Sequence, residues 1–204
     1  MEINGFVIEA GAKLAGADLP AADLSGARLA YADLTEADLT DSDLSGASLH
    51  SANLTEAKLS MSNLSKANLD SANLVRADLT KANLSSSKLV YANLKGADLT
   101  DADLTDVDLT SADLDGADLT RADLTGAKIS MATLREAHLK GANLKGASLR
   151  FASLKGASLE EANLKGADLT GADLTRADLT DSKLDGAKFH KTTMPDGSAI
   201  KTLT

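Results

Sequence analysis

The chain has 204 residues and a formal net charge of −9, and 71 of its 88 apolar residues are Leu or Ala. The negative charge disfavours direct binding to nucleic acid, which requires Lys and Arg to displace counterions, and five aromatic residues without any Trp argue against a base-stacking surface. The absence of Cys excludes disulfides, thiolate metal sites and Cys nucleophiles.

A core made almost entirely of Leu and Ala cannot interlock in the way that mixed branched and aromatic side chains do. The composition therefore predicts a repetitive geometry. Leu, Ile, Val and Phe together make up about 23% of the chain, which is close to the level at which a charged chain stays disordered. Composition alone thus leaves order undecided.

Residues 1–11 precede the regular part of the chain. They have neither a basic start nor a long apolar run, and no stretch anywhere approaches 18 consecutive apolar residues. We therefore expect a soluble, cytoplasmic protein without a membrane partner. Ile3, Phe6 and Ile8 lie outside the repeat that follows, and we expect this segment to cap its first coil.

From residue 12 the chain repeats every five residues. Thirty-six positions, from 14 to 189, hold 34 Leu, Ile129 and Phe189 without an insertion. Two positions before each of them stands Ala in 31 units, and the exceptions are Ser42, Ser62, Ser87, Ser182 and Val107. The intervening residue is mostly Asp or Asn, so the unit reads A-[D/N]-L-x-x.

This period fits neither a helix nor a plain strand. Five residues advance an α-helix by about 500°, which would scatter the Leu side chains around the cylinder. In an uninterrupted strand an odd step would point successive Leu side chains to opposite faces. The remaining solution is a short extended segment that turns Ala and Leu inward, followed by a corner that restores the facing.

Glycine indicates where the corners lie. All 12 Gly residues between positions 16 and 186 stand at the second position after the Leu, where a tight turn can require a positive φ. Other corners carry bulk or charge, and the two kinds alternate with a ten-residue period. This alternation fits a closed coil with an even number of corners, but it does not give that number.

The tandem ADLT, ANLS and ANLK units resemble the pentapeptide-repeat family from residue 12 to about 194. The resemblance implies an all-β fold, a right-handed quadrilateral parallel β-helix (a solenoid) with four pentapeptides per coil. Leu and Ala would point inward, while Asp or Asn and both x positions would point outward. About nine four-sided coils are implied, which form a rod roughly 43 Å long at the spacing of paired strands.

No Pro-rich, Ser-rich or charged linker divides the chain, so we expect one rod. Its parts are an N-terminal cap segment (1–11), the pentapeptide-repeat β-helix (12–194) and a C-terminal turn and tail (195–204), which begins with the turn signal Pro195-Asp196-Gly197. Each end of a β-helix is an open edge. Capping at both ends predicts a monomer, and stacking on a second copy predicts an end-to-end homodimer.

Neither a catalytic nor a metal site can be assembled from the sequence. His50, His138 and His190 all occupy outward positions, and no two of them belong to neighbouring coils of the implied fold. The Asp and Ser side chains of a convex rod also have no cleft that excludes water. We expect no enzyme activity, no cofactor and no metal.

Acidic residues suggest a first candidate binding surface. In the implied fold Asp98 stacks on Asp118 and Asp103 on Asp123, although like charges about 5 Å apart repel by roughly 1 kcal/mol even in a water-like dielectric. These four residues form a candidate acidic face for a partner protein. The alternative is that Asp and Asn only hydrogen-bond the backbone at each corner.

A second candidate surface is apolar and basic. Met131 and Phe151 lie twenty residues apart at the same corner position, close to Arg135 and Arg150. Large apolar side chains beside Arg are typical of contact patches between proteins, although scattered exposed apolar residues are also ordinary. Either a binding patch or a coincidence accounts for them.

These observations favour a non-enzymatic, regulatory rod that binds a protein partner of unknown identity. Relatives in cyanobacteria often end with a similar Met-Pro-Asp-Gly turn, and one is linked to the control of heterocyst differentiation. The alternative implied by the resemblance is a DNA mimic that protects or inhibits DNA gyrase. Such relatives have a Phe-rich core near a dimer interface and a C-terminal helix, whereas this core is almost purely Leu.

Overall fold

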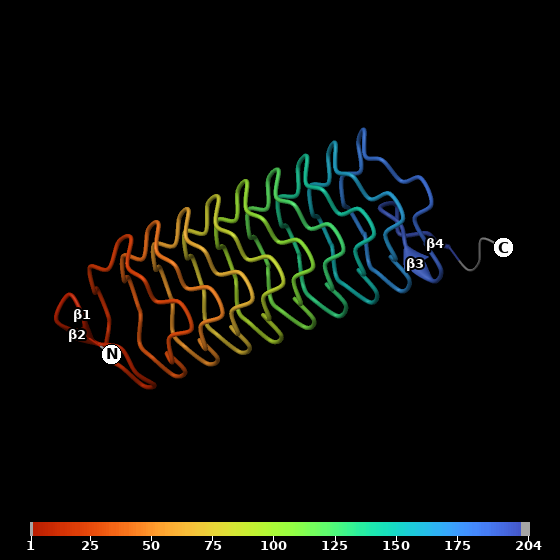
Figure 1. The fold of residues 1–204 in the computed structure, drawn as a ribbon. Coiled ribbons are helices and arrows are strands. Elements are labelled where there is room, and N and C mark those ends of the chain that lie inside the picture. The colour runs from red at the N-terminus through yellow and green to blue at the C-terminus, as the bar shows by residue number, and fades with distance from the viewer. Residues whose placement is uncertain (1, 201–204) are drawn as a thin grey trace.

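The Ala-x-Leu segments form the walls of a long rod. In the computed structural model, which describes residues 2–200, stacked coils follow one another along a single axis with the two chain ends at opposite ends of the rod (Figure 1). The middle residue of each segment forms a parallel bridge with the residue twenty positions later, from Lys13 with Asp33 to Asp173 with Thr193. Because a bridge recurs every five residues, each turn of twenty residues has four bridge positions.

Each bridge uses both backbone groups of its middle residue. The N–H of Asp33 donates to the carbonyl of Ala12 at 2.9 Å, and the carbonyl of Asp33 accepts the N–H of Leu14 at 2.7 Å. The flanking residues already turn into the corners, so a side is too short to extend this pairing into a longer strand. The walls therefore consist of isolated bridges.

The corners are tight turns of two residues after each Leu. The carbonyl of Leu34 accepts the N–H of Ala37 at 3.1 Å, and the corner residue Glu36 donates its own N–H to Thr55 of the next coil at 2.9 Å. Glu36 has a φ of 56° and Gly16 a φ of 65°. Positive φ is thus a property of the second corner position whether or not it holds Gly, which goes beyond the role that the sequence suggested for glycine.

Packing between corners accounts for some of the glycines. A Cβ added at Gly171 would overlap the ring of Phe151, which lies one coil earlier, and a Cβ at Gly126 would overlap the carboxylate of Asp106. Large corner side chains therefore lean over the following coil. Glycine leaves them room there.

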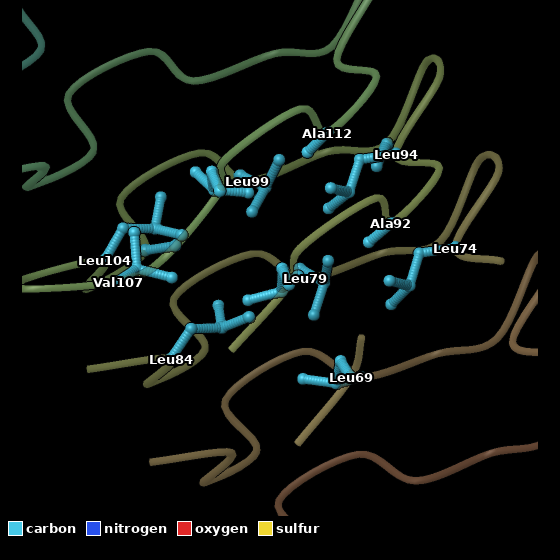
Figure 2. Close-up of a cluster of buried hydrophobic side chains, with 14 of the residues drawn as sticks. Leu69, Leu74, Leu79, Leu84, Ala92, Leu94, Leu99, Leu104, Val107 and Ala112 are labelled. Carbon is cyan, nitrogen blue, oxygen red and sulfur yellow. The ribbon is translucent and has the colours of Figure 1, made fainter. Parts of the chain in front are cut away.

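Leu and Ala fill the interior in columns. Leu74 and Leu94 stack in neighbouring coils, as do Leu79 and Leu99 (Figure 2). Ser at an inward Ala position is satisfied locally, since the hydroxyl of Ser87 donates to the carbonyl of Leu84 at 2.6 Å. Within residues 2–200 no buried side-chain polar atom lacks a hydrogen-bond partner.

Short antiparallel hairpins lie at both ends. Strands β1 (Glu2–Ile3) and β2 (Phe6–Val7) pair at the N-terminal end, and β3 (Thr192–Thr193) and β4 (Ala199–Ile200) pair at the C-terminal end (Figure 1).

The first hairpin packs on the core through Ile3 and Phe6, and Ile8 is buried. In the last turn Leu184 and Phe189 are only partly buried, whereas Leu174 is fully buried. The two ends of the rod are thus covered to different degrees by the described residues.

Candidate functional site

Four sides run along the rod, and we name them by their bridge residues, which recur every twenty positions. Side A contains residues 18 to 178, side B 23 to 183, side C 28 to 188 and side D 13 to 193. Sides A and B meet at the A/B edge, which contains residues 40–41 and the pair twenty positions later in each following coil. Sides C and D meet at the C/D edge, which contains residues 30–31 and the pair twenty positions later in each following coil, to 190–191. The two edges lie diagonally opposite each other.

Charge is divided around the rod. The bridge positions of sides A and B carry ten Asp and two Lys, a net charge of −8, whereas those of sides C and D carry five Asp and five Lys or Arg. The ten Asp residues are Asp18, Asp38, Asp78, Asp98, Asp118 and Asp178 on side A, and Asp23, Asp43, Asp103 and Asp123 on side B. One half of the circumference is therefore acidic and the other is balanced.

The four predicted acidic residues lie in the middle of this half. Asp98 bridges Asp118 on side A, and Asp103 bridges Asp123 on side B, so the structure brings each pair together on adjoining sides. Each carboxylate also accepts a backbone N–H from its own corner, as Asp98 does from Thr100 at 2.9 Å. Both the clustering and the corner hydrogen bonds considered from the sequence are present.

The corner hydrogen bond does not require a charge. On side B the amide oxygen of Asn83 accepts the N–H of Ser85 at 3.0 Å and its hydroxyl at 2.7 Å. One coil later Asp103 accepts the N–H of Thr105 at 2.9 Å in the same way. Since Asn closes the corner as well as Asp does, corner geometry leaves the charge of Asp103 unexplained.

Some acidic groups on these sides are held in the charged form. Hydrogen bonds from the hydroxyl and then the N–H of Thr180 lower the pKa of Asp178 below its usual value. At the A/B edge the guanidinium of Arg121 contacts both carboxylate oxygens of Asp101, at 2.7 and 2.8 Å, and lowers the pKa of that carboxyl. Arg121 thus neutralises this edge locally, whereas the flanking sides keep a surplus of Asp, among which Asp38 pairs with Lys58 at 3.4 Å.

The apolar and basic candidates are only partly brought together. Met131 donates its N–H to the carbonyl of Arg150 at 2.9 Å, which places it beside Phe151 of the next coil. The guanidinium carbon of Arg150 lies 5.7 Å from the centre of the Phe151 ring. Arg135 stands at the following corner, where it binds Asp115 at 2.7 Å. Three of the four residues thus share the C/D edge.

Five of the ten basic residues between positions 131 and 200 form ion pairs. Arg150 contacts Asp168 at 3.2 Å, and similar contacts are made by Arg135, Lys140, Lys155 and Lys165. Burial alone would raise the pKa of Asp168, but hydrogen bonds from Thr170 and then Arg150 keep it below its usual value. Half of the basic side chains in this part of the rod are therefore engaged in ion pairs within it.

Sequence reasoning found the row of apolar residues on the C/D edge but not its position opposite the acidic sides. That relation depends on the number of corners in a turn, about which a five-residue period is silent. Steps of twenty, which the family resemblance implies, already stack Asp98 on Asp118 and place Met131 and Phe151 in one column. Summing the charge of each such column would also have revealed the division of charge around the rod.

The rest of the described surface offers little for chemistry. Among residues 2–200 no group of three or more His, Asp or Glu side chains is placed to hold a metal ion. A surface hollow of ≈ 550 Å³ at the N-terminal end is open to solvent and lies between residues 8–10 and 25–28. The same part of the chain contains no helix that is long and apolar enough to cross a membrane.

Comparison with known proteins identifies the repeat. A model of the pentapeptide-repeat family matches eight stretches, of which all but the first overlap: residues 10–46, 47–85, 62–101, 77–114, 102–141, 132–166, 142–181 and 157–194. No curated protein matches the chain.

Several solved structures are similar. HetL, a pentapeptide repeat protein involved in heterocyst differentiation regulation from the cyanobacterium Nostoc sp. strain PCC 7120, is 38% identical over 92% of this chain and 91% of its own, with a TM-score of 0.39. Rfr23 from the cyanobacterium Cyanothece 51142 is 36% identical over 57% of this chain and 63% of its own, with a TM-score of 0.33.

QnrB1, a plasmid-mediated fluoroquinolone resistance protein, resembles the rod in a trypsin-treated form. It is 22% identical over 85% of this chain and 82% of its own, with a TM-score of 0.60, a likeness that shows the fold alone. No catalytic family is among the matches. The repeat matches from residue 10 to residue 194 and the identity with HetL show that the chain belongs to the pentapeptide-repeat family, whose fold is a right-handed β-helix.

Proposed function

We propose that the protein is a non-enzymatic, regulatory rod of about nine four-sided coils that binds a basic surface of another protein through sides A and B. The twenty-residue bridge register supports the coil count. In this proposal residues 1–11 cap the β-helix of residues 12–194, and residues 195–204 are the turn and tail, with residues 1 and 201–204 outside the described part of the chain. Binding takes place in the cytoplasm.

The surplus of charge on sides A and B carries the proposal. Asn closes the corners as well as Asp does, as Asn83 and Asp103 demonstrate on the same side. Closing the corners therefore does not account for the ten charges of these Asp residues, which repel one another. A row of fixed carboxylates on a rigid wall attracts a partner with Lys and Arg, steers its approach and selects against acidic proteins.

Charge-matched variants test this proposal. The first replaces Asp98, Asp103, Asp118 and Asp123 with Asn, which keeps the corner hydrogen bonds and removes four charges. The control replaces Asp33, Asp108, Asp113 and Asp173 with Asn on sides C and D, which changes the net charge equally. Circular dichroism and thermal midpoints check that both variants fold.

The measurement is affinity capture from a native lysate, followed by titration of the captured protein against each variant. We expect the wild type and the control to retain the same partner and the side A and B variant to lose it. Salt should weaken this binding, because exposed charges are screened. Equal retention by both variants would exclude sides A and B as the binding surface.

A second candidate function is mimicry of DNA towards DNA gyrase. The observation in its favour is the acidic half of the circumference, since the likeness to QnrB1 extends only to the fold. A supercoiling assay with purified gyrase decides the matter. Inhibition of gyrase, or its protection against a fluoroquinolone, at micromolar protein supports mimicry only if the side A and B variant lacks the same effect. If the wild type neither inhibits nor protects gyrase, this candidate function is excluded.

A further inference from the structure

The C/D edge combines exposed apolar side chains with an almost complete lack of charge. Four of its second corner positions hold Tyr31, Tyr91, Met131 and Phe151, which are 66%, 69%, 57% and 59% exposed. The intervening second corner positions hold Ser51, Ser71 and Ser111, and the last two hold Gly171 and Lys191. Of the eighteen residues on this edge, only Asp70, Arg150 and Lys191 carry a formal charge.

Asp70 and Arg150 are engaged within the rod, whereas Lys191 stands at the last corner of the edge. The carboxylate of Asp70 accepts the N–H of Val90 in the next coil at 2.9 Å. Arg150 reaches Asp168 on side C at 3.2 Å while its guanidinium lies over the ring of Phe151. The edge therefore presents rings, a thioether and hydroxyl groups to the solvent.

From this arrangement we infer that the C/D edge is the contact surface between two copies of this chain that lie side by side and parallel. Two molecules that each carry a net charge of −9 repel each other, most strongly through sides A and B. Contact through the diagonally opposite edge keeps these acidic sides as far apart as the shape of the rod allows. The apolar residues lie where this repulsion is weakest.

The parallel arrangement follows from symmetry and charge. A twofold axis parallel to the rod places every edge residue opposite its own copy at the same height, so the apolar row matches itself without any spacing requirement. It also lays side C of one copy beside side D of the other. The bridge positions of side C have a net charge of +2 and those of side D a net charge of −2. An antiparallel pair would instead place C beside C and D beside D.

This inference is independent of the proposed function, because it uses the opposite edge of the rod. The variant that replaces Asp98, Asp103, Asp118 and Asp123 with Asn should self-associate at least as well as the wild type. Failure of one proposal therefore leaves the other standing.

Sedimentation equilibrium tests the association. Between about 5 and 300 μM, the range in which small interfaces become populated, the wild-type mass should rise from 21.0 kDa towards twice that value. A variant with Met131→Ser and Phe151→Ser should bind itself at least about tenfold more weakly. Met61→Ser is the matched control, because Met61 is 52% exposed at the same corner position of the A/B edge.

Two outcomes of this experiment overturn the inference. If the mass of the wild type stays at 21.0 kDa over the whole concentration range, the chain does not associate with itself and the C/D edge is not a contact between two copies. An association that survives the double substitution points to another surface, such as the partly buried last turn around Leu184.

Single cysteines then test the orientation, since the chain has no Cys of its own. Ser71→Cys and Ser111→Cys lie two coils apart on the C/D edge, and in a parallel pair each faces its own copy. Mild oxidation with copper phenanthroline should convert both variants to disulfide dimers and leave Met61→Cys monomeric. In an antiparallel pair only a residue on the twofold axis meets its own copy, so cross-linking of one variant or of neither would reject the parallel arrangement.

Discussion

At the scale of single residues, the second corner position sets the backbone constraint of the whole rod. Ser71 and Glu36 adopt φ values of 57° and 56°, in a region that costs an L-residue roughly 1–2 kcal/mol. These conformations persist because the corner N–H groups are paired with the next coil, as that of Ser71 is with Val90 at 2.8 Å. The stacked coils thus hold their corners in a conformation that isolated pentapeptides would avoid.

Two glycines separate the conformational cost of a corner from its steric cost. Gly16 and Gly171 both have positive φ, but a Cβ meets nothing within 4 Å at Gly16 and overlaps the Phe151 ring at Gly171. We expect Gly16→Ala to lower the free energy of unfolding by roughly 1 kcal/mol, and Gly171→Ala to lower it more. Urea titrations measure both values.

The matched control adds Phe151→Ser to each glycine variant. This second substitution should reduce the cost of Gly171→Ala to that of Gly16→Ala and leave the latter unchanged. Equal costs for the two glycines in the presence of Phe151 would contradict the steric account.

At the scale of the coil, stability is shared between neighbours. Each side contributes one bridge to the coil before it and one to the coil after it, and Leu columns such as Leu79 and Leu99 run through the interior (Figure 2). In such a stack stability is approximately a sum over coils and their interfaces. An inner coil has two interfaces, whereas the last has one.

Leu→Ala substitutions at two heights measure this difference. Leu104 is fully buried in the middle of the rod, and its replacement should lower the free energy of unfolding by about 2–5 kcal/mol. Leu184 is partly buried in the last turn, so its replacement should cost clearly less. Thermal and urea unfolding monitored by circular dichroism provide both values, and equal losses would mean that the last turn is as well packed as the middle.

At the level of the coil, the five-residue repeat is sufficient to predict which side chains point inward. Leu and Ala at fixed positions predicted inward side chains, and this is confirmed for nearly every unit, including Val107 at an Ala position. The positive φ at corners such as Tyr31 was not predicted, because no residue preference signals it there. The relation between the acidic sides and the apolar edge needs the twenty-residue register, which the backbone hydrogen bonds establish and the core pattern does not.

At the scale of the whole molecule, many corner carboxylates change the pH dependence of stability in the same direction, because their pKa values are lowered in the folded state. Hydrogen bonds from Thr35 lower the pKa of Asp33, and hydrogen bonds from Ser25 lower that of Asp23, in each case through the hydroxyl and then the N–H. A carboxyl whose pKa is lower in the folded state binds protons more weakly there than in the unfolded state. Its contribution to the free energy of unfolding is complete above its pKa in the unfolded chain, and this contribution disappears as the pH falls through its pKa in the folded protein.

The rod should therefore lose stability in acid. We expect the thermal midpoint to be constant from neutral pH down to about 5 and to fall below about pH 4, where the corner carboxyls of the unfolded chain protonate. Replacing Asp23, Asp33 and Asp178 with Asn should make this fall shallower, because Asn accepts the same corner hydrogen bonds at every pH. Circular dichroism at pH values between 7 and 2.5 checks it, and a midpoint that stays constant across the range would show that the corners contribute no pH dependence.

The bridge register also determines how the rod can change in length. The core repeats after five residues, but an outward residue returns to the same side only after twenty. Removing one pentapeptide between Asp98 and Asp118 would leave the interior pattern intact and rotate every later residue by one side, so that Asp118 would fall in the column of side D rather than in that of Asp98 on side A. Removing four consecutive units would shorten the rod without mixing its columns. Insertions and deletions that preserve the surface are therefore confined to whole coils, while the interior accepts any multiple of five.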